Sequence, residues 1–152
     1  MAVAQKGDVI YVNRGLYQHY GIYNNDKSVI HFSPDQGKEI SPENAYIRET
    51  SLLEFLSGGN LEIDHSVKPV FPAEEIVHRA LRLVGTNLKK YKLLSFNCEH
   101  FAFWCSTGKL KSKQVRKGAT IAGGVTLAAT AAVLLKILLD KDKPARGEQR
   151  EV

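Results

Sequence analysis

Cysteine is scarce in this chain. Only two of the 152 residues are Cys, at positions 98 and 105, and no Cys-x-x-Cys pair occurs. On a helix, a spacing of seven residues separates two side chains by roughly 10 Å along the axis, so these two could not bridge each other. The first eight residues are polar and charged and lack the apolar core of a secretion signal. These absences favour the reducing cytosol and two free thiols.

An excess of one charge is also missing from most of the chain. Residues 1–108 carry 11 basic and 12 acidic side chains, whereas residues 109–152 carry 10 basic and 4 acidic ones. The formal net charge of +5 therefore comes entirely from the C-terminal part, which argues against a nucleic-acid-binding domain. With 43% hydrophobic residues, the chain is long enough for one domain with a core and a short appendage.

Short β-branched and aromatic runs dominate the first part of the chain. Residues 8–13, 18–23 and 28–33 each predict a strand, and the last two are expected to form a hairpin across an Asn/Asp-rich loop. Further strands are expected at residues 46–50 and 60–65, with a helical turn at residues 52–56 between them.

Two helices are predicted to follow the strands. The first covers residues 71–85, starts with a Pro and two acids and ends at a Gly. Its expected apolar stripe consists of Ile76, Val77, Ala80, Leu81 and Val84. The second begins near Asn97, a good N-cap residue, and ends at Gly108. Strands first and helices after predict an α+β fold in which helices pack on an antiparallel sheet.

The composition changes after Gly108. Five basic side chains without an acid precede 18 uncharged residues, and across Lys136 the apolar run extends to 22 residues, 118–139. This length meets the roughly 20 residues that span a bilayer, although a helix in the interface or packed on its own domain remains an alternative. The basic residues are Lys109, Lys111, Lys113, Arg116 and Lys117. They are expected to bind the membrane surface and to keep the preceding domain on the cytoplasmic side.

The chain is therefore expected to have four parts. Residues 1–110 form a catalytic domain, residues 111–117 a basic juxtamembrane stretch, residues 118–139 an apolar membrane-associating helix, and residues 140–152 a polar tail.

Cys98 is the first candidate for chemistry. Asn97 would cap the helix that Cys98 opens, and the dipole and free N–H groups of a helix N-terminus favour a thiolate. A buried Cys that acts only as a small hydrophobic residue is the commoner alternative. Cys105 shares its helix face with Phe101 and is expected to lie in the core.

Two histidines can supply a base. His19 and His31 share one face of the hairpin if paired positions sum to an even number, as when 19 pairs with 31, 21 with 29 and 23 with 27. This register leaves a three-residue loop at positions 24–26. One imidazole could then take the thiol proton while the other orients it. A zinc site is the rival use of these residues, but Cys98 and His100 point roughly 200° apart on a helix, so neither a metal nor another cofactor is expected.

At these residues the sequence resembles a known family. Asn-Cys-Glu-His-Phe at positions 97–101, preceded by His-Tyr-Gly-Ile-Tyr at 19–23 and Val-Ile-His-Phe at 29–32, closely resembles the lecithin:retinol acyltransferase-like family. This family is a circularly permuted branch of the NlpC/P60 papain-like fold. The resemblance spans about residues 7–117, and the apolar C-terminal segment is similar to the membrane anchor of the small phospholipid-acting members.

The resemblance implies a membrane-associated thiol acyltransferase or phospholipase. Cys98 would attack a phosphoglyceride ester, and water, an amine or an alcohol would resolve the acyl-cysteine. By the family pattern His19 is the base and His31 the third member, while Tyr17 would help to stabilise the oxyanion and Asn97 would support the site. Glu99 and His100 point away from Cys98 and are interpreted as supporting residues.

Two other functions fit parts of the pattern. Permuted papain-like isopeptidases carry a similar motif with Asn at the position of Glu99, and the basic and apolar C-terminal part favours the lipid family over them. A membrane-tethered adaptor without turnover has no reason to keep Cys98, His19 and His31 together.

Overall fold

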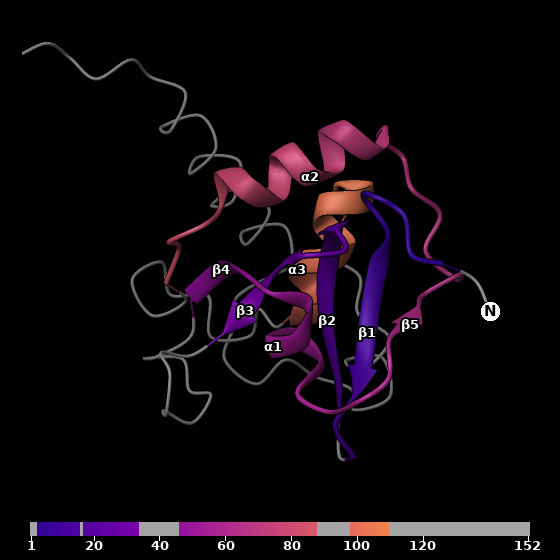
Figure 1. Ribbon diagram of the computed structural model, residues 1–152. Coiled ribbons are helices and arrows are strands. Elements are labelled where there is room, and N and C mark those ends of the chain that lie inside the picture. Colours follow the sequence, from indigo (N-terminus) through magenta and orange to yellow (C-terminus); the bar gives the residue numbers. More distant parts are fainter. Residues whose placement is uncertain (1–2, 16, 34–45, 88–97, 110–152) are drawn as a thin grey trace, which may run out of the picture.

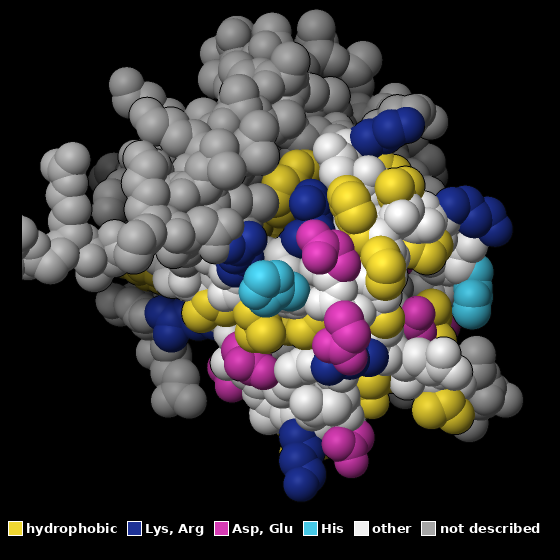
Figure 2. Space-filling view, turned by 90° about the horizontal axis from the view of Figure 1, so that it is seen from above, with side chains coloured by type: hydrophobic (Ala, Val, Ile, Leu, Met, Phe, Trp, Pro, Cys, Tyr) yellow, Lys and Arg dark blue, Asp and Glu magenta, His cyan; other side chains and the backbone are white. Residues whose placement is uncertain are grey.

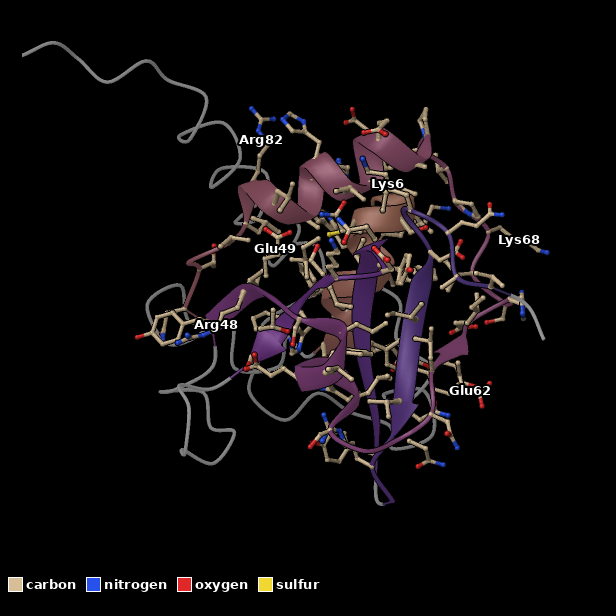
Figure 3. The ribbon with its side chains drawn as sticks, in the orientation of Figure 1. Lys6, Arg48, Glu49, Glu62, Lys68 and Arg82 are labelled. Carbon is tan, nitrogen blue, oxygen red and sulfur yellow. The ribbon has the colours of Figure 1, made fainter. Side chains whose placement is uncertain are left out.

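The computed structural model describes residues 3–15, 17–33, 46–87 and 98–109. They form a five-stranded antiparallel sheet in the order β4-β3-β2-β1-β5, with three helices packed on it (Figure 1), so the predicted α+β class is confirmed. The strands are β1 (Val9–Asn13), β2 (Gln18–Asn25), β3 (Ser28–Ser33), β4 (Tyr46–Thr50) and β5 (Glu62–Ile63). The helices are α1 (Leu52–Leu56), α2 (Ala73–Arg82) and α3 (Cys98–Thr107).

The two faces of the sheet bury different clusters, because side chains alternate along each strand. One face packs against α2 and α3 and holds aromatic and aliphatic residues such as Ile22, Phe101 and Trp104. The opposite face packs against α1, where Phe55 is fully buried. Figure 1 shows α1 and α3 on opposite sides of β2 and β3, with α2 across one end of the sheet.

Helix α2 has a buried stripe that differs in part from the predicted one. Ile76, Val77 and Ala80 are buried as expected, but Leu81 and Val84 are each 36% exposed, and Leu83 is fully buried in their place. Positions 76, 80 and 83 follow the i, i+4, i+7 spacing of one helix face, and position 81 lies about 100° away from position 80. The helix ends at Arg82, earlier than expected.

The hairpin of β2 and β3 has a different register from the predicted one. Gly21 pairs with His31 and Tyr23 with Val29, so the sum of paired positions is even as expected but each pair is shifted by two residues. A bulge between Tyr23 and Asn25 then takes up one residue, and Asn25 pairs with Ser28. The predicted three-residue loop is therefore wrong, because the bulge leaves a two-residue turn.

The C-terminal predictions concern residues that the structure does not describe. The basic residues after Lys109, the apolar segment 118–139 and the tail 140–152 lie outside the described ranges, as does Asn97. Within the part of the chain that is described, no helix has the length and apolar character needed to cross a membrane.

Candidate active site

Two histidines lie side by side on the α1 face of the sheet. His19 comes from β2 and His31 from β3, and their side chains are 4% and 3% exposed. The His19 Nε2 and His31 Nδ1 atoms are 2.8 Å apart, and the rings are nearly perpendicular. The predicted common face is confirmed. Since His31 is paired with Gly21, the two imidazoles meet diagonally across the strands instead of directly opposite.

A glycine makes room for this arrangement. Gly21 stands between the two histidines on the same face, and a Cβ built there would lie 2.9 Å from Cε2 of Phe55 and 2.8 Å from a methyl carbon of Val29. The Phe55 ring instead packs against both imidazoles, with centroid distances of 5.3 Å to His19 and 5.1 Å to His31. Gly in a strand often marks such a close approach, and this signal was available in the sequence.

Helix α1 holds Phe55 in place through both of its ends. Ser51 is the N-cap, and its hydroxyl oxygen accepts a hydrogen bond from the Glu54 N–H. At the other end, Nη2 of Arg14 donates to the Phe55 carbonyl oxygen at 2.8 Å, which satisfies a helix carbonyl that has no intrahelical partner. Arg14 was not predicted as a site residue, because only the tertiary fold brings it to α1.

The environment keeps both imidazoles neutral. Burial, and to a lesser degree the charge of Arg14, lowers the pKa of His19 to about 4. Burial, followed by the charge of His19, lowers the pKa of His31 to about 3. Each ring therefore carries one proton at neutral pH, and each has one nitrogen that accepts and one that donates. The second nitrogen of His31, Nε2, is 2.7 Å from Oγ1 of Thr50 at the end of β4.

Cys98 is the first residue of α3, as predicted, and it lies beside a break in the sheet. Among the described residues, pairing between β2 and β3 ends at Gly21 and His31, although β3 continues to Ser33 against β4. On the side of β2 that faces β3, the backbone of Gln18 and Tyr20 therefore has no strand partner among the described residues. Strand β1 pairs with the opposite edge of β2. The thiol occupies the edge without a strand partner.

The thiol is bound to the backbone on either side of His19. Its sulfur donates to the Gln18 carbonyl oxygen at 3.8 Å, and the backbone N–H of Tyr20 also hydrogen bonds to it. In the described part of the chain, the Cys98 thiol is thus bonded to β2 backbone and to neither imidazole. Because this strand edge is open, Cys98 reaches from the α3 face to the backbone next to His19. The ring of His19 itself lies on the α1 face.

The thiol is protonated in this state. Burial raises the pKa of Cys98 above its ordinary value, and the backbone N–H groups of Tyr20 and Glu99 oppose this shift without reversing it. The expectation of a thiolate at the helix start is therefore wrong for this state, because burial outweighs the helix N-terminus. The Cys105 thiol is fully buried and free, in agreement with its predicted place in the core, and burial raises its pKa further.

The remaining motif residues surround this site at different depths. Tyr17 is 43% exposed, and its ring meets the His19 ring edge-on with the centroids 6.5 Å apart. Glu99 and His100 are both buried on the α3 side, and their interpretation as supporting residues stays a prediction. The negative charge of Glu99 contributes to the raised pKa of Tyr20 on the neighbouring strand, after burial and the charge of Asp64.

Comparison with known proteins identifies the family. The family model of lecithin retinol acyltransferase matches residues 3–111. The chain belongs to this family. Its relatives include human phospholipase A and acyltransferase 2, which is 35% identical over 92% of this chain and 93% of the relative. Mouse phospholipase A and acyltransferase 3 is 34% identical over 90% of this chain and 91% of its own length. Rat lecithin retinol acyltransferase is 32% identical, over 74% of this chain and 58% of its own length.

Membership in the lecithin retinol acyltransferase family agrees with the resemblance drawn from the two histidines and the Asn-Cys-Glu-His-Phe motif. The matched region contains His19, His31 and Cys98 and extends to the start of the basic stretch. Phe55, Arg14 and Thr50 complete the surroundings of the histidines, and no local motif in the sequence pointed to them. Their contacts join positions up to 41 residues apart, and local sequence patterns do not predict contacts over such separations.

Proposed function

We propose that this protein is a thiol acyltransferase and phospholipase that cleaves an acyl ester of a phosphoglyceride through an acyl-Cys98 intermediate. The observation that carries the proposal is the buried His19–His31 pair beside the strand edge that binds the Cys98 thiol. Relatives that match nearly the full chain are named phospholipase A and acyltransferase, which supports the choice of substrate class. The sheet and the helix that starts at Cys98 also fit a permuted NlpC/P60 papain-like arrangement.

In the proposed reaction, the sulfur of Cys98 attacks the ester carbonyl carbon while Nδ1 of His19 takes the thiol proton. This nitrogen is the one available, since Nε2 of His19 is bonded to His31. Collapse of the tetrahedral intermediate breaks the bond to the alcohol oxygen, and the imidazolium returns its proton to that leaving group. Water, an amine or an alcohol then attacks the thioester carbonyl carbon while His19 again accepts the proton. The carbon–sulfur bond breaks, and His19 returns the proton to the Cys98 sulfur. Tyr17 and backbone N–H groups are proposed to stabilise the oxyanion.

The electrostatics favour proton transfer during the attack over a pre-formed ion pair. Burial raises the pKa of Cys98 and lowers the pKa of His19 to about 4, so thiol and imidazole are both neutral before substrate binds. A neutral pair requires the thiol to leave its bond with the Gln18 carbonyl and to meet His19 as the ester arrives. Hydrogen bonds of a site without substrate are often arranged differently from those of the reacting complex.

The site is proposed to work at a membrane surface. The basic residues from Lys109 to Lys117 would attract anionic lipid at about 1 kcal/mol each, and the apolar segment 118–139 would hold the domain at the bilayer with its site on the cytoplasmic side. The full chain should float with vesicles that contain phosphatidylserine. Replacing all five basic residues by Gln should weaken this binding, more strongly for anionic than for neutral vesicles. Equal binding of both proteins to both vesicles would contradict a role for these charges.

The central experiment looks for the acyl-enzyme. The full chain is incubated with phosphatidylcholine of defined acyl chains, and intact-protein mass spectrometry followed by peptide mapping locates any adduct. We expect the mass of one acyl group on Cys98 and none in Cys98→Ser, while Cys105→Ala should acylate like the parent. Turnover of an isopeptide substrate with no adduct from phospholipid would instead support the isopeptidase alternative and contradict the proposal.

A further inference from the structure

The hydrogen bonds behind the histidine pair form one continuous chain. His19 Nε2 meets His31 Nδ1 at 2.8 Å, and His31 Nε2 meets Oγ1 of Thr50 at 2.7 Å. Thr50 Oγ1 in turn donates to the carbonyl oxygen of Ser51 at 3.2 Å. Four groups from β2, β3, β4 and the start of α1 are thus connected in sequence. The distances alone do not say on which nitrogen each imidazole carries its proton.

The far end of the chain decides the direction of the donors. A threonine hydroxyl has one hydrogen, and the Ser51 carbonyl oxygen can only accept, so the arrangement that satisfies both neighbours of Oγ1 has the hydroxyl donating to Ser51. Thr50 therefore accepts from His31, so His31 carries its proton on Nε2 and its Nδ1 is an acceptor. His19 must then donate to it from Nε2. A neutral imidazole has only one proton, which leaves Nδ1 of His19 free to accept another.

The opposite direction would disable the pair. If Thr50 donated to His31, the proton of His31 would lie on Nδ1 and that of His19 would also move to Nδ1. A protonated Nδ1 cannot take the thiol proton. Both arrangements have the same hydrogen-bond distances, so only the group that terminates the chain distinguishes them.

Helix α1 fixes the group that terminates the chain. The Ser51 carbonyl oxygen also accepts the Phe55 N–H at 3.1 Å, the first backbone bond of the helix. Phe55 itself packs against both imidazoles, so the same short helix orients the carbonyl and confines the rings. The Thr50 hydroxyl lies between the buried His31 ring and the Ser51 carbonyl oxygen, at 2.7 Å from the first and 3.2 Å from the second.

We propose that Thr50 is a positioning residue of the active site: its hydroxyl, bonded to the Ser51 carbonyl, fixes His31 in the Nε2–H form and thereby keeps Nδ1 of His19 unprotonated. The inference rests on the proposed function for its purpose, since the unprotonated Nδ1 is the atom that takes the Cys98 proton. The tautomers themselves are a property of the protein without substrate.

The first test reads the tautomers directly. Two-bond ¹H–¹⁵N spectra of the full chain at pH 7.5 distinguish a protonated ring nitrogen from a bare one, and His19→Gln and His31→Gln assign the signals. We expect the proton on Nε2 of both His19 and His31. Protons on Nδ1 of both rings would overturn the inference, and this measurement requires no Thr50 variant to fold.

The second test changes Thr50. Thr50→Val keeps the shape of the side chain and removes the hydroxyl, so the buried Nε2–H of His31 loses its acceptor and the proton of each ring is expected to move toward Nδ1. Thr50→Ser keeps the hydroxyl and should keep the parental spectrum. Unchanged tautomers in Thr50→Val would contradict the inference.

Activity gives a separate readout. With phosphatidylcholine as substrate, kcat of Thr50→Val should fall on the order of tenfold with little change in KM, because a His19 protonated on Nδ1 cannot take the thiol proton. Loss of the partner that orients a metal-binding histidine has an effect of similar size. Thr50→Ser should restore kcat to within about threefold. Thr86→Val is the matched control: Thr86 Oγ1 is buried and has no hydrogen-bond partner among the described residues. The Thr86 carbonyl binds the N–H of Ile47, whose side chain packs on the α2 and α3 face, so this variant should keep the parental kcat.

The two readouts separate the two proposals. In one outcome, the parent has both protons on Nε2, these protons shift in Thr50→Val, and the parent does not cleave phospholipid. This outcome would support the inference and contradict the proposed function. In the other outcome, the parent cleaves phospholipid, but His19 and His31 carry their protons on Nδ1, or Thr50→Val and Thr86→Val lose kcat equally. This outcome would support the function and contradict the inference.

Discussion

The two faces of the sheet are built from the same alternating strands but differ in what they bury. Among the described residues, the apolar cluster on the α2 and α3 face has fourteen buried residues and the cluster on the α1 face has six. The smaller cluster lies beside the two buried histidines, and the Phe55 ring of α1 packs against both imidazoles. The larger face supplies more of the apolar packing energy, and the smaller one holds the two histidines in fixed positions.

This difference shows how the fold accommodates buried imidazoles. Burial of a polar group is costly unless it is hydrogen bonded, and the His19–His31–Thr50 chain satisfies three of the four ring nitrogens. The large core on the opposite face offsets the remaining cost. Cys98 connects the faces, since it starts a helix of the large face and binds the strand edge next to His19.

The largest expected effect distinguishes the two ends of α3. Cys98→Ala should lower phospholipid turnover by about 10⁴-fold or more, since a nucleophile has no substitute. Cys105→Ala should keep turnover within about threefold and cost roughly 1 kcal/mol of stability, because Cys105 only fills the large core. Steady-state kinetics and urea unfolding measure both. Similar turnover in the two variants would contradict the assignment of Cys98 as the nucleophile and of Cys105 as a core residue.

The next effect separates the two histidines. His19→Ala should lower kcat by roughly 10² to 10⁴-fold, the usual contribution of a general base. His31→Asn should cost less, on the order of tenfold, since Asn can still accept a hydrogen bond from His19. Single-turnover acylation of Cys98 is the measurement. A larger loss in His31→Asn than in His19→Ala would reverse the assigned roles.

A matched pair of phenylalanines tests the faces directly. Phe55 and Phe101 are both fully buried, one on each face. Phe55→Leu and Phe101→Leu should each lower the free energy of unfolding by about 1 to 2 kcal/mol. Only Phe55→Leu should also lower kcat per folded molecule, by a factor of about three to ten, because it loosens both imidazoles. Equal kcat values in the two variants, measured where both are folded, would show that the faces are functionally equivalent.

The smallest effect near neutral pH concerns stability. The folded pKa values of His19 and His31, about 4 and about 3, lie below the unfolded value of 6.5, so the unfolded chain binds more protons as the pH falls. The stability from the neutral pair is fully present above pH 6.5 and should decline below it by up to about 1.4 kcal/mol per pH unit for each histidine.

Urea unfolding at several pH values between 7.5 and 4 measures this decline. The double variant His19→Gln, His31→Gln lacks both titrating rings and should show a clearly flatter dependence of stability on pH. If the free energy of unfolding depends equally on pH in the parent and in the double variant, the two histidines are not the cause of the acid destabilisation.

Local patterns in the sequence were sufficient for the elements and for the parity of the histidines. Hydrophobic periodicity and the boundary residues Gly, Pro and Asn placed most elements close to their observed positions. Examples are the strands at 9–13, 28–33 and 46–50 and the helices that begin at Leu52 and Cys98. The common face of His19 and His31 needed only the period of two along each strand. These features depend on residues that are neighbours in the sequence, and sequence reasoning reaches them.

By itself, then, the sequence determined that a thiol begins a helix and that two histidines share one face of a hairpin. Only the tertiary structure decided that a bulge shifts the hairpin by two residues, that β3 leaves β2 at Gly21, and that the thiol fills the vacated edge. It also decided that burial keeps the thiol protonated and that Thr50 terminates the histidine chain. The physical reason is that register, desolvation and hydrogen-bond direction depend on groups brought together from distant parts of the chain, whereas alternation and capping depend on adjacent ones.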